Sequence, residues 1–167
     1  MRIGVISDTH NHLPNVSRIV DLMNAAGVAR VIHTGDITQA KTLEAFSHMN
    51  APLCGVYGNN DVERASLDAA AQRLGVELHE PLLELEWAGR AILVAHDPRE
   101  FEAALPAANA RGEAPALILH GHDHRFRLES RHGARVFNPG ECAGHMTGYN
   151  AVGVVDLATL ACEKLLF

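Results

Sequence analysis

The N-terminal third of the chain alternates between short apolar runs and longer segments with helical spacing. Apolar runs rich in β-branched residues at positions 3–6, 30–34 and 53–57 indicate buried strands. Between them, apolar side chains recur at helical spacing at about 15–26 and 39–49, which predicts two helices. This β-α-β-α-β order predicts parallel strands that are joined by right-handed helical crossovers.

The pattern changes after an alanine-rich, helical segment at positions 65–74. From about 77 to 87 the chain moves to an alternation of leucine and glutamate. A tight turn at Ala88-Gly89 then precedes an apolar run at 91–95. Alternation on both sides of a short turn predicts an antiparallel hairpin.

The C-terminal part is expected to hold one more helix, at about 99–110, and to be rich in strands, with a turn at His132-Gly133. The expected strands are 116–119, 126–130, 134–137, 151–156 and 162–167. The whole pattern predicts an α/β fold: a two-sheet αββα sandwich with mixed parallel and antiparallel strands and flanking helices. Because no linker or repeat divides the 167 residues, we expect a single domain over residues 1–167.

Composition narrows the class of protein. Apolar residues make up 47% and charged residues 20%, which is ordinary for a globular protein, and the formal charge of −6 argues against binding of extended nucleic acid. Neither a membrane-spanning run nor a signal-peptide pattern is present, so we expect a cytoplasmic protein without membrane association. Cys54, Cys142 and Cys162 lack metal-site spacing and are expected to be small buried residues.

The residues that carry candidate chemistry follow the predicted strands. They are, in chain order, Asp8, His10, Asp36, Asn59, His96, His122 and His124. Because open α/β sheets bind ligands at the carboxyl ends of their strands, we expect these side chains to converge. Side chains two positions apart in extended backbone point the same way, so Asp8 and His10 are expected to reach one cation.

Carboxylate, amide and imidazole donors in this number exceed what one tetrahedral ion needs. We therefore expect two divalent ions per chain: manganese first, with iron, zinc, nickel or cobalt as alternatives. Asp36 is the expected bridge, because its strand would lie between the other two. Two ions about 3.5–4 Å apart clamp an in-line displacement at phosphorus and lower the pKa of a bridging water, which predicts phosphoester hydrolysis. The expected catalytic centre is Asp36, Asn59 and His96.

The motifs also resemble those of a known family, the calcineurin-like metallophosphoesterase superfamily. The matching motifs are Asp8-x-His10, Gly35-Asp36, Gly58-Asn59, His96 and Gly121-His122-x-His124. The short length and the Asn138-Pro139-Gly140 loop resemble its small single-domain phosphodiesterase branch, and the resemblance extends from Arg2 to at least Gly148. It implies the two-sheet sandwich. It also implies two ligand sets that share a carboxylate: Asp8, His10, Asp36 and His124 at one metal, and Asp36, Asn59, His96 and His122 at the other.

We accordingly expect a metal-dependent phosphodiesterase that takes a small phosphodiester substrate and does not bind extended nucleic acid. The sequence leaves open whether the protein forms a homo-oligomer. One alternative is a non-catalytic scaffold of the same fold, similar to the retromer subunit of this superfamily. A phosphomonoesterase or nucleotide hydrolase on the same metals is another.

Three residues depart from the family pattern. Asn60 stands where many members carry a proton-donating histidine, so we expect no leaving-group acid at this position. Asp97 follows His96 where glycine is common, so a different turn is expected there. Asp123 lies between the two final histidines, where it either orients a ligand imidazole or faces solvent.

Other polar residues are candidates to support the ligands or to move a proton. His33 is either a partner of the site or a hydrogen-bonded core histidine, and Asp61 is a candidate supporting residue beside Asn60. His120 is a candidate to line the pocket or to replace the missing proton donor. Glu141 and Asn138 are candidates for the pocket rim. The other histidines are expected to be solvated: His12, His48, His79, His132 and His145.

Overall fold

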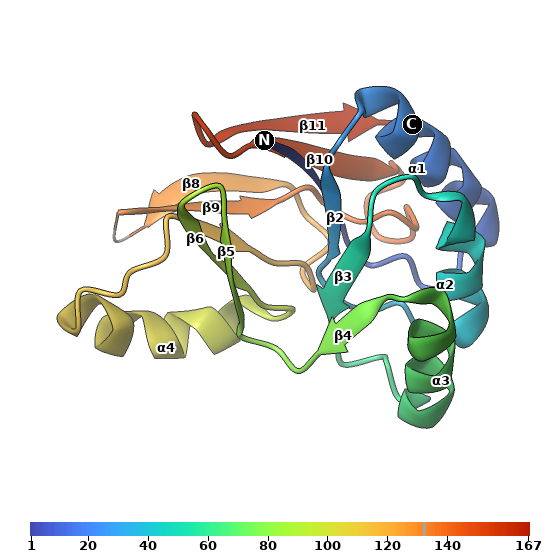
Figure 1. The fold of residues 1–167 in the computed structure, drawn as a ribbon, viewed down its shortest axis with the longest axis horizontal. Coiled ribbons are helices and arrows are strands. Elements are labelled where there is room, and N and C mark those ends of the chain that lie inside the picture. Colours follow the sequence, from blue (N-terminus) through green and yellow to red (C-terminus); the bar gives the residue numbers. More distant parts are fainter. Residues whose placement is uncertain (132) are drawn as a thin grey trace.

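The computed structural model describes residues 1–131 and 133–167. It has two sheets that lie face to face, with α1, α2 and α3 on the outside of one sheet and α4 on the outside of the other (Figure 1). This is the α/β sandwich with mixed strands that the sequence predicted. Within the described part of the chain, no helix combines the length and the hydropathy that are needed to cross a bilayer.

The first sheet has six strands in the order β11-β10-β1-β2-β3-β4. Its parallel strands are β1 (Arg2–Ile6), β2 (Arg30–His33), β3 (Leu53–Val56) and β4 (Glu77–His79). β10 (Ala151–Asp156) runs antiparallel to β1, and β11 (Ala161–Leu166) runs antiparallel to β10. Three helices connect the parallel strands: α1 (Leu13–Ala26), α2 (Ala40–Ala45) and α3 (Arg64–Leu74).

The second sheet has five strands in the order β5-β6-β7-β9-β8. The predicted hairpin is confirmed as β5 (Leu83–Trp87) and β6 (Arg90–Val94). The other elements are α4 (Pro98–Ala110), β7 (Leu117–Leu119), β8 (Arg127–Arg131) and β9 (Ala134–Asn138). β6, β7 and β9 are parallel, and β8 pairs antiparallel with β9.

Two segments differ from the prediction. The expected helix at 39–49 ends early, because α2 tightens into a short 3₁₀ helix, η1 (Phe46–His48), a common way for a helix to close. Residues 77–79 do not belong to the hairpin: they form β4, which pairs parallel with β3. Sequence alternation could not separate these two strands, because it does not say which sheet a strand joins.

The first three strands are apolar on both faces because both faces are covered. Along β1, Ile3 and Val5 pack in the core between the sheets, whereas Ile6 packs under the helices. A third apolar cluster joins α4 to the second sheet through Phe101 and Leu105. This arrangement fixes the strands rigidly, and the loops that follow β1, β2, β3, β6 and β7 carry the predicted site residues.

Candidate metal centre

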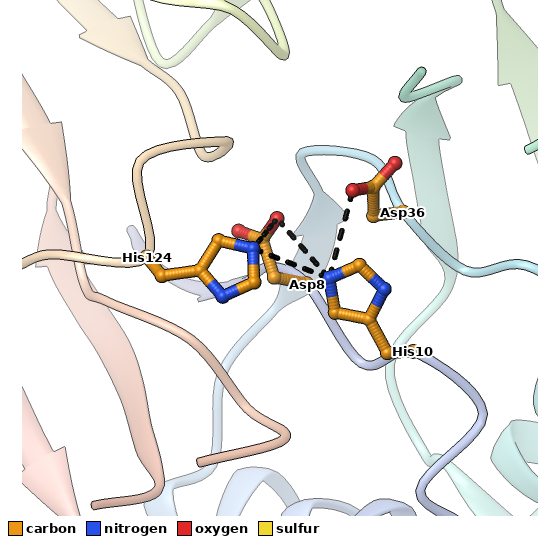
Figure 2. Close-up of side chains that lie close together, drawn as sticks. All are labelled: Asp8, His10, Asp36 and His124. Carbon is orange, nitrogen blue, oxygen red and sulfur yellow. Dashed lines mark hydrogen bonds and ion pairs between the residues drawn. The ribbon is translucent and has the colours of Figure 1, made fainter. Parts of the chain in front are cut away.

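Four of the predicted ligands form one compact group. The ligand atoms of Asp8, His10, Asp36 and His124 all lie within 4.8 Å of one another (Figure 2). His10 Nε2 is 3.3 Å from His124 Nε2 and 3.6 Å from Asp36 Oδ2. His124 Nε2 is in turn 3.4 Å from Asp8 Oδ1. Side chains from three loops therefore converge on a single point.

The chemistry of this first group fits a cation. Asp8 is fully buried, and its Oδ1 has no hydrogen-bond partner among the described residues. Burial raises the pKa of Asp8 and lowers that of His10, because water is withheld from both charged forms. An orphaned carboxylate oxygen beside two facing imidazole nitrogens is the kind of donor set that divalent manganese, iron or zinc takes.

The remaining predicted ligands form a second group around one amide oxygen. Asn59 Oδ1 is 3.0 Å from His96 Nε2 and 2.9 Å from His122 Nδ1. His96 Nε2 also lies 3.5 Å from Asp36 Oδ1. The second group is thus linked to the first through Asp36.

Asp36 presents a different oxygen to each group. Its Oδ2 faces His10 and its Oδ1 faces His96. Burial alone would raise the pKa of this carboxyl, but the His96 imidazole and hydrogen bonds from Asn60 hold it well below its ordinary range. An ionised carboxylate with one oxygen toward each group can connect two cations.

His96 is held in one orientation by the backbone. Its Nδ1–H donates to the carbonyl oxygen of Thr34 at 2.8 Å, so Nε2 is directed at Asp36 and Asn59. Burial lowers the pKa of His96, yet the Asp36 carboxylate outweighs this and raises it to about 9. In the metal-free protein the ring is therefore a cation at neutral pH, in the place where a metal cation would carry the charge.

Glu141 supports His124 from behind. Its Oε2 accepts from His124 Nδ1 at 2.6 Å, while Oε1 accepts the N–H groups of Met146 and Thr147 at 2.7 and 2.8 Å. Although burial raises the pKa of Glu141, the hydrogen bonds from Thr147, His124 and Met146 lower it overall. A carboxylate behind an imidazole fixes the tautomer that leaves Nε2 free for a metal. The sequence indicated Glu141 only as part of the pocket rim.

Asn60 and Asp61 tie the loop after β3 to the loop after β2. The backbone N–H and side-chain Nδ2 of Asn60 donate to Oδ1 and Oδ2 of Asp36 at 2.9 and 2.8 Å. Asp61 Oδ2 accepts the N–H groups of Asp36 and Gly58 at 3.0 and 2.6 Å. Both residues therefore position Asp36, and the amide of Asn60 is already engaged there.

The backbone around the ligands is unusual. The expectation that Asp8 and His10 reach one side through extended backbone was wrong, because their φ angles are 52° and 40°. Left-handed φ angles recur at three other predicted ligands: Asp36, His122 and His124. Each such residue costs about 1–3 kcal/mol, and strain of this kind concentrates at functional sites.

Two glycines let the loops approach closely. A Cβ on Gly58 would collide with Asp36, and a Cβ on Gly121 would collide with Ser7 and Asp8. Gly121 therefore brings the loop after β7 against the loop after β1. Ser7 was not singled out in the sequence, yet its hydroxyl donates to Asp8 Oδ2.

Asp97 forms the differently shaped turn that was expected, and the contacts of Asp123 are with the second sheet. Asp97 has extended backbone, φ −88°, because it caps α4 in a capping box with Glu100, so no left-handed turn forms there. Its Oδ2 lies 3.4 Å from His122 Nε2, which makes it the residue that faces a ligand imidazole. Asp123 instead accepts from Asn138 Nδ2 at 2.7 Å and from Arg127 at 3.1 Å, and so holds the loop to the second sheet.

His120 and His33 are both fully buried outside the two groups. The ring of His120 packs 5.4 Å from that of Phe101 in α4 and has no exposed surface. His33 donates through Nε2 to Thr9 Oγ1 at 3.0 Å and accepts the Gly35 N–H at 3.1 Å. Of the two alternatives for His33, these contacts favour the hydrogen-bonded core histidine.

One histidine that was expected to be solvated lies at the edge of the site. His145 is exposed, but its ring lies 6.0 Å from that of His10 and 6.1 Å from that of His12. Nothing in the spacing of the sequence could place it there, because it comes from the irregular loop after β9. The expectation for His132 lies outside the described residues.

Comparison with known proteins shows the family of the chain. The model of the calcineurin-like phosphoesterase superfamily domain matches residues 1–160. Phosphodiesterase MJ0936 of Methanocaldococcus jannaschii is 32% identical over 157 residues, which cover 93% of each chain. The solved structure of an archaeal phosphodiesterase superposes with a TM-score of 0.90 at 28% identity, with both chains covered completely.

The fold extends to more distant proteins. Vps29 from Entamoeba histolytica superposes with a TM-score of 0.69 at 17% identity, over 100% of this chain and 99% of its own. Identity this low shows a shared fold and nothing about activity. The match over residues 1–160, together with the 32% identical relative, places this chain in the calcineurin-like phosphoesterase superfamily.

Proposed function

We propose that this protein is a phosphodiesterase that hydrolyses small phosphodiesters with two divalent metal ions. The observation that carries the proposal is the position of Asp36, whose two oxygens face two separate donor groups. The 32% identical phosphodiesterase supports the reaction class. The fold alone does not support a reaction class, because proteins of only 17% identity share it.

The residues would hold the ions in two overlapping sets. The first is Asp8, His10, Asp36 and His124, and the second is Asp36, Asn59, His96 and His122. Ions bound there would supply Lewis-acid activation of the phosphoryl oxygens and of an attacking water. Manganese is the first candidate, because it accepts oxygen and imidazole donors together.

The chain's own residues provide orientation. Thr34 and Glu141 fix the rings of His96 and His124, so that Nε2 of each is directed into the site. Asn60 holds both oxygens of Asp36 in place and cannot protonate a departing alkoxide. The preferred substrates are therefore diesters whose leaving group is already a stable anion, such as a phenolate.

A metal and substrate panel tests the proposal. Protein stripped with a chelator and reloaded with manganese, iron, zinc, nickel or cobalt should bind about two ions per chain and hydrolyse aryl diesters. General acid catalysis is typically worth about 10²–10⁴-fold, so its absence should make the rate fall steeply as the leaving-group pKa rises. Full turnover by stripped protein would contradict the metal mechanism. Two bound ions without hydrolysis of any mono- or diester would favour a scaffold.

A further inference from the structure

A small pocket lies directly beside the candidate metal centre. It has a volume of about 140 Å³ and is lined by His124 on one side. Apolar side chains of Phe126, Pro139, Tyr149 and Leu166 form most of the rest. We call it the ring pocket. None of these apolar side chains takes part in the site described above.

Three apolar side chains of the ring pocket are unusually exposed. Phe126 is 45% exposed, Tyr149 65% and Leu166 59%, although most large apolar residues of this chain are buried. Scattered exposed apolar residues need no explanation, but a group that lines one concave site marks a surface for binding. Because His124 and its partner Glu141 also line the ring pocket, the pocket shares a wall with the candidate metal centre.

Two cations complement the negative charge of a substrate. Arg125 and Lys164 both line the ring pocket, and Lys164 Nζ lies 4.5 Å from the centre of the Phe126 ring. In the described part of the chain, neither of their side chains forms an ion pair with a carboxylate. The carboxylate of Glu141 lines the ring pocket as well, but its two oxygens already accept hydrogen bonds from His124, Met146 and Thr147. In a protein with a formal charge of −6, this local positive charge favours a phosphate ester at the adjoining centre.

The size of the ring pocket limits the group that fits. A cavity of about 150 Å³ in another protein holds one benzene molecule. The volume of about 140 Å³ therefore suits a single six-membered ring and not a larger fused system. Aromatic walls favour a planar ring, because edge-to-face or offset contacts add to the burial of its surface.

We propose that the ring pocket binds the aromatic ring of one ester group of the substrate, so that the protein selects aryl or single-ring nucleoside phosphodiesters over alkyl ones. This proposal rests on the proposed function and names its substrate class. Phe126 and Tyr149 are the specificity-determining residues. They contact the ring and not the phosphorus.

Binding of two non-hydrolysable phosphonates to the metal-loaded protein tests the ring pocket separately from the reaction. Phenylphosphonate should bind about tenfold more tightly than methylphosphonate, measured by titration calorimetry. Phe126→Ala and Tyr149→Ala should each remove most of this preference and leave methylphosphonate affinity unchanged. Leu128→Ala is the matched control: Leu128 is 39% exposed on the neighbouring strand β8 but does not line the pocket, so the preference should persist.

Each outcome distinguishes the two proposals. Equal affinity for both phosphonates in the natural protein, or an unchanged preference in both alanine variants, would overturn the ring pocket while the metal centre stands. Failure of methylphosphonate to bind the loaded natural protein would count against the proposed function itself.

Discussion

At the scale of single residues, Asp36 is the most informative side chain. It is nearly fully buried, and its two oxygens face the two donor groups. Its position follows from strand order, because β2 lies between β1 and β3. The sequence predicted this central position, because parallel crossovers place the loop after the second strand between the loops of its two neighbours.

Replacement of the shared carboxylate should be more harmful than replacement of a ligand to one ion. Asp36→Ala removes a ligand from both groups and leaves two cations to repel each other, whereas Asn59→Ala removes one from the second group alone. Removal of a supporting residue costs up to about 100-fold in activity, and we expect Asp36→Ala to lower aryl-diester turnover by more than that. We also expect it to retain less metal than Asn59→Ala. Metal content and aryl-diester turnover give the comparison. Equal, mild losses would mean that Asp36 does not bridge.

Asn60 shows where sequence reasoning reached its limit. The absence of a histidine was visible, but the two hydrogen bonds to Asp36 were not, because they depend on the geometry of two loops that are distant in sequence. The departure from the family pattern thus has a positive role. The residue positions the carboxylate.

Truncation of this side chain should weaken metal binding. Asn60→Ala removes the bond from Nδ2 to Asp36 Oδ2 but keeps the backbone bond to Oδ1. A hydrogen bond to a charged group is worth about 1.5–3 kcal/mol, so we expect metal affinity to fall about tenfold or more. Calorimetric metal titration measures this, with Asn50→Ala as the control, because Asn50 is exposed and precedes β3 whereas Asn60 follows it. Unchanged affinity would show that Asn60 merely fills the loop.

At the scale of elements, most of the fold could be predicted, and the failures have physical causes. Strands β1, β2 and β3 were evident because burial on both faces requires uninterrupted apolar runs. The loop after β9 was not, because Asn138, Pro139 and Gly140 carry no periodicity. Glu141 was therefore expected only at the pocket rim, and the position of His145 near His10 was missed.

That loop should control how well the first group holds its ion. Glu141→Gln keeps an oxygen for the N–H groups of Met146 and Thr147 but removes the negative charge behind His124. Loss of such a partner typically costs about 10–100-fold in metal affinity, and we expect one of the two ions to be lost first on dilution. Glu163→Gln, an exposed position on β11, serves as the control. Identical two-site titrations for both variants would argue against this support.

At the scale of the whole molecule, the buried His33 links folding to pH. Burial lowers its pKa to about 3, whereas a histidine in the unfolded chain has the ordinary value of 6.5. Between these values the unfolded state binds more protons than the folded state. The contribution of His33 to stability is therefore fully present above pH 6.5 and is lost as the pH falls toward 3.

Urea unfolding of metal-free protein at several pH values should show this. Between about pH 6.5 and 4, protonation of His33 in the unfolded state should lower the free energy of unfolding by up to about 1.4 kcal/mol for each unit by which the pH falls. His33→Gln should be less stable at neutral pH but should have a shallower pH dependence over this window. Parallel curves for the two proteins would place the proton uptake elsewhere.

The pairing of β10 with β1 sets the order in which the molecule can assemble. Asp8 follows β1, but this strand gains its second neighbour only when residues 151–156 have left the ribosome. Until then β1 is an open edge, and the buried surroundings of Asp8 are incomplete. The loop that carries Asp8 thus gains its full support only after β10 has been made, although β10 follows far along the chain.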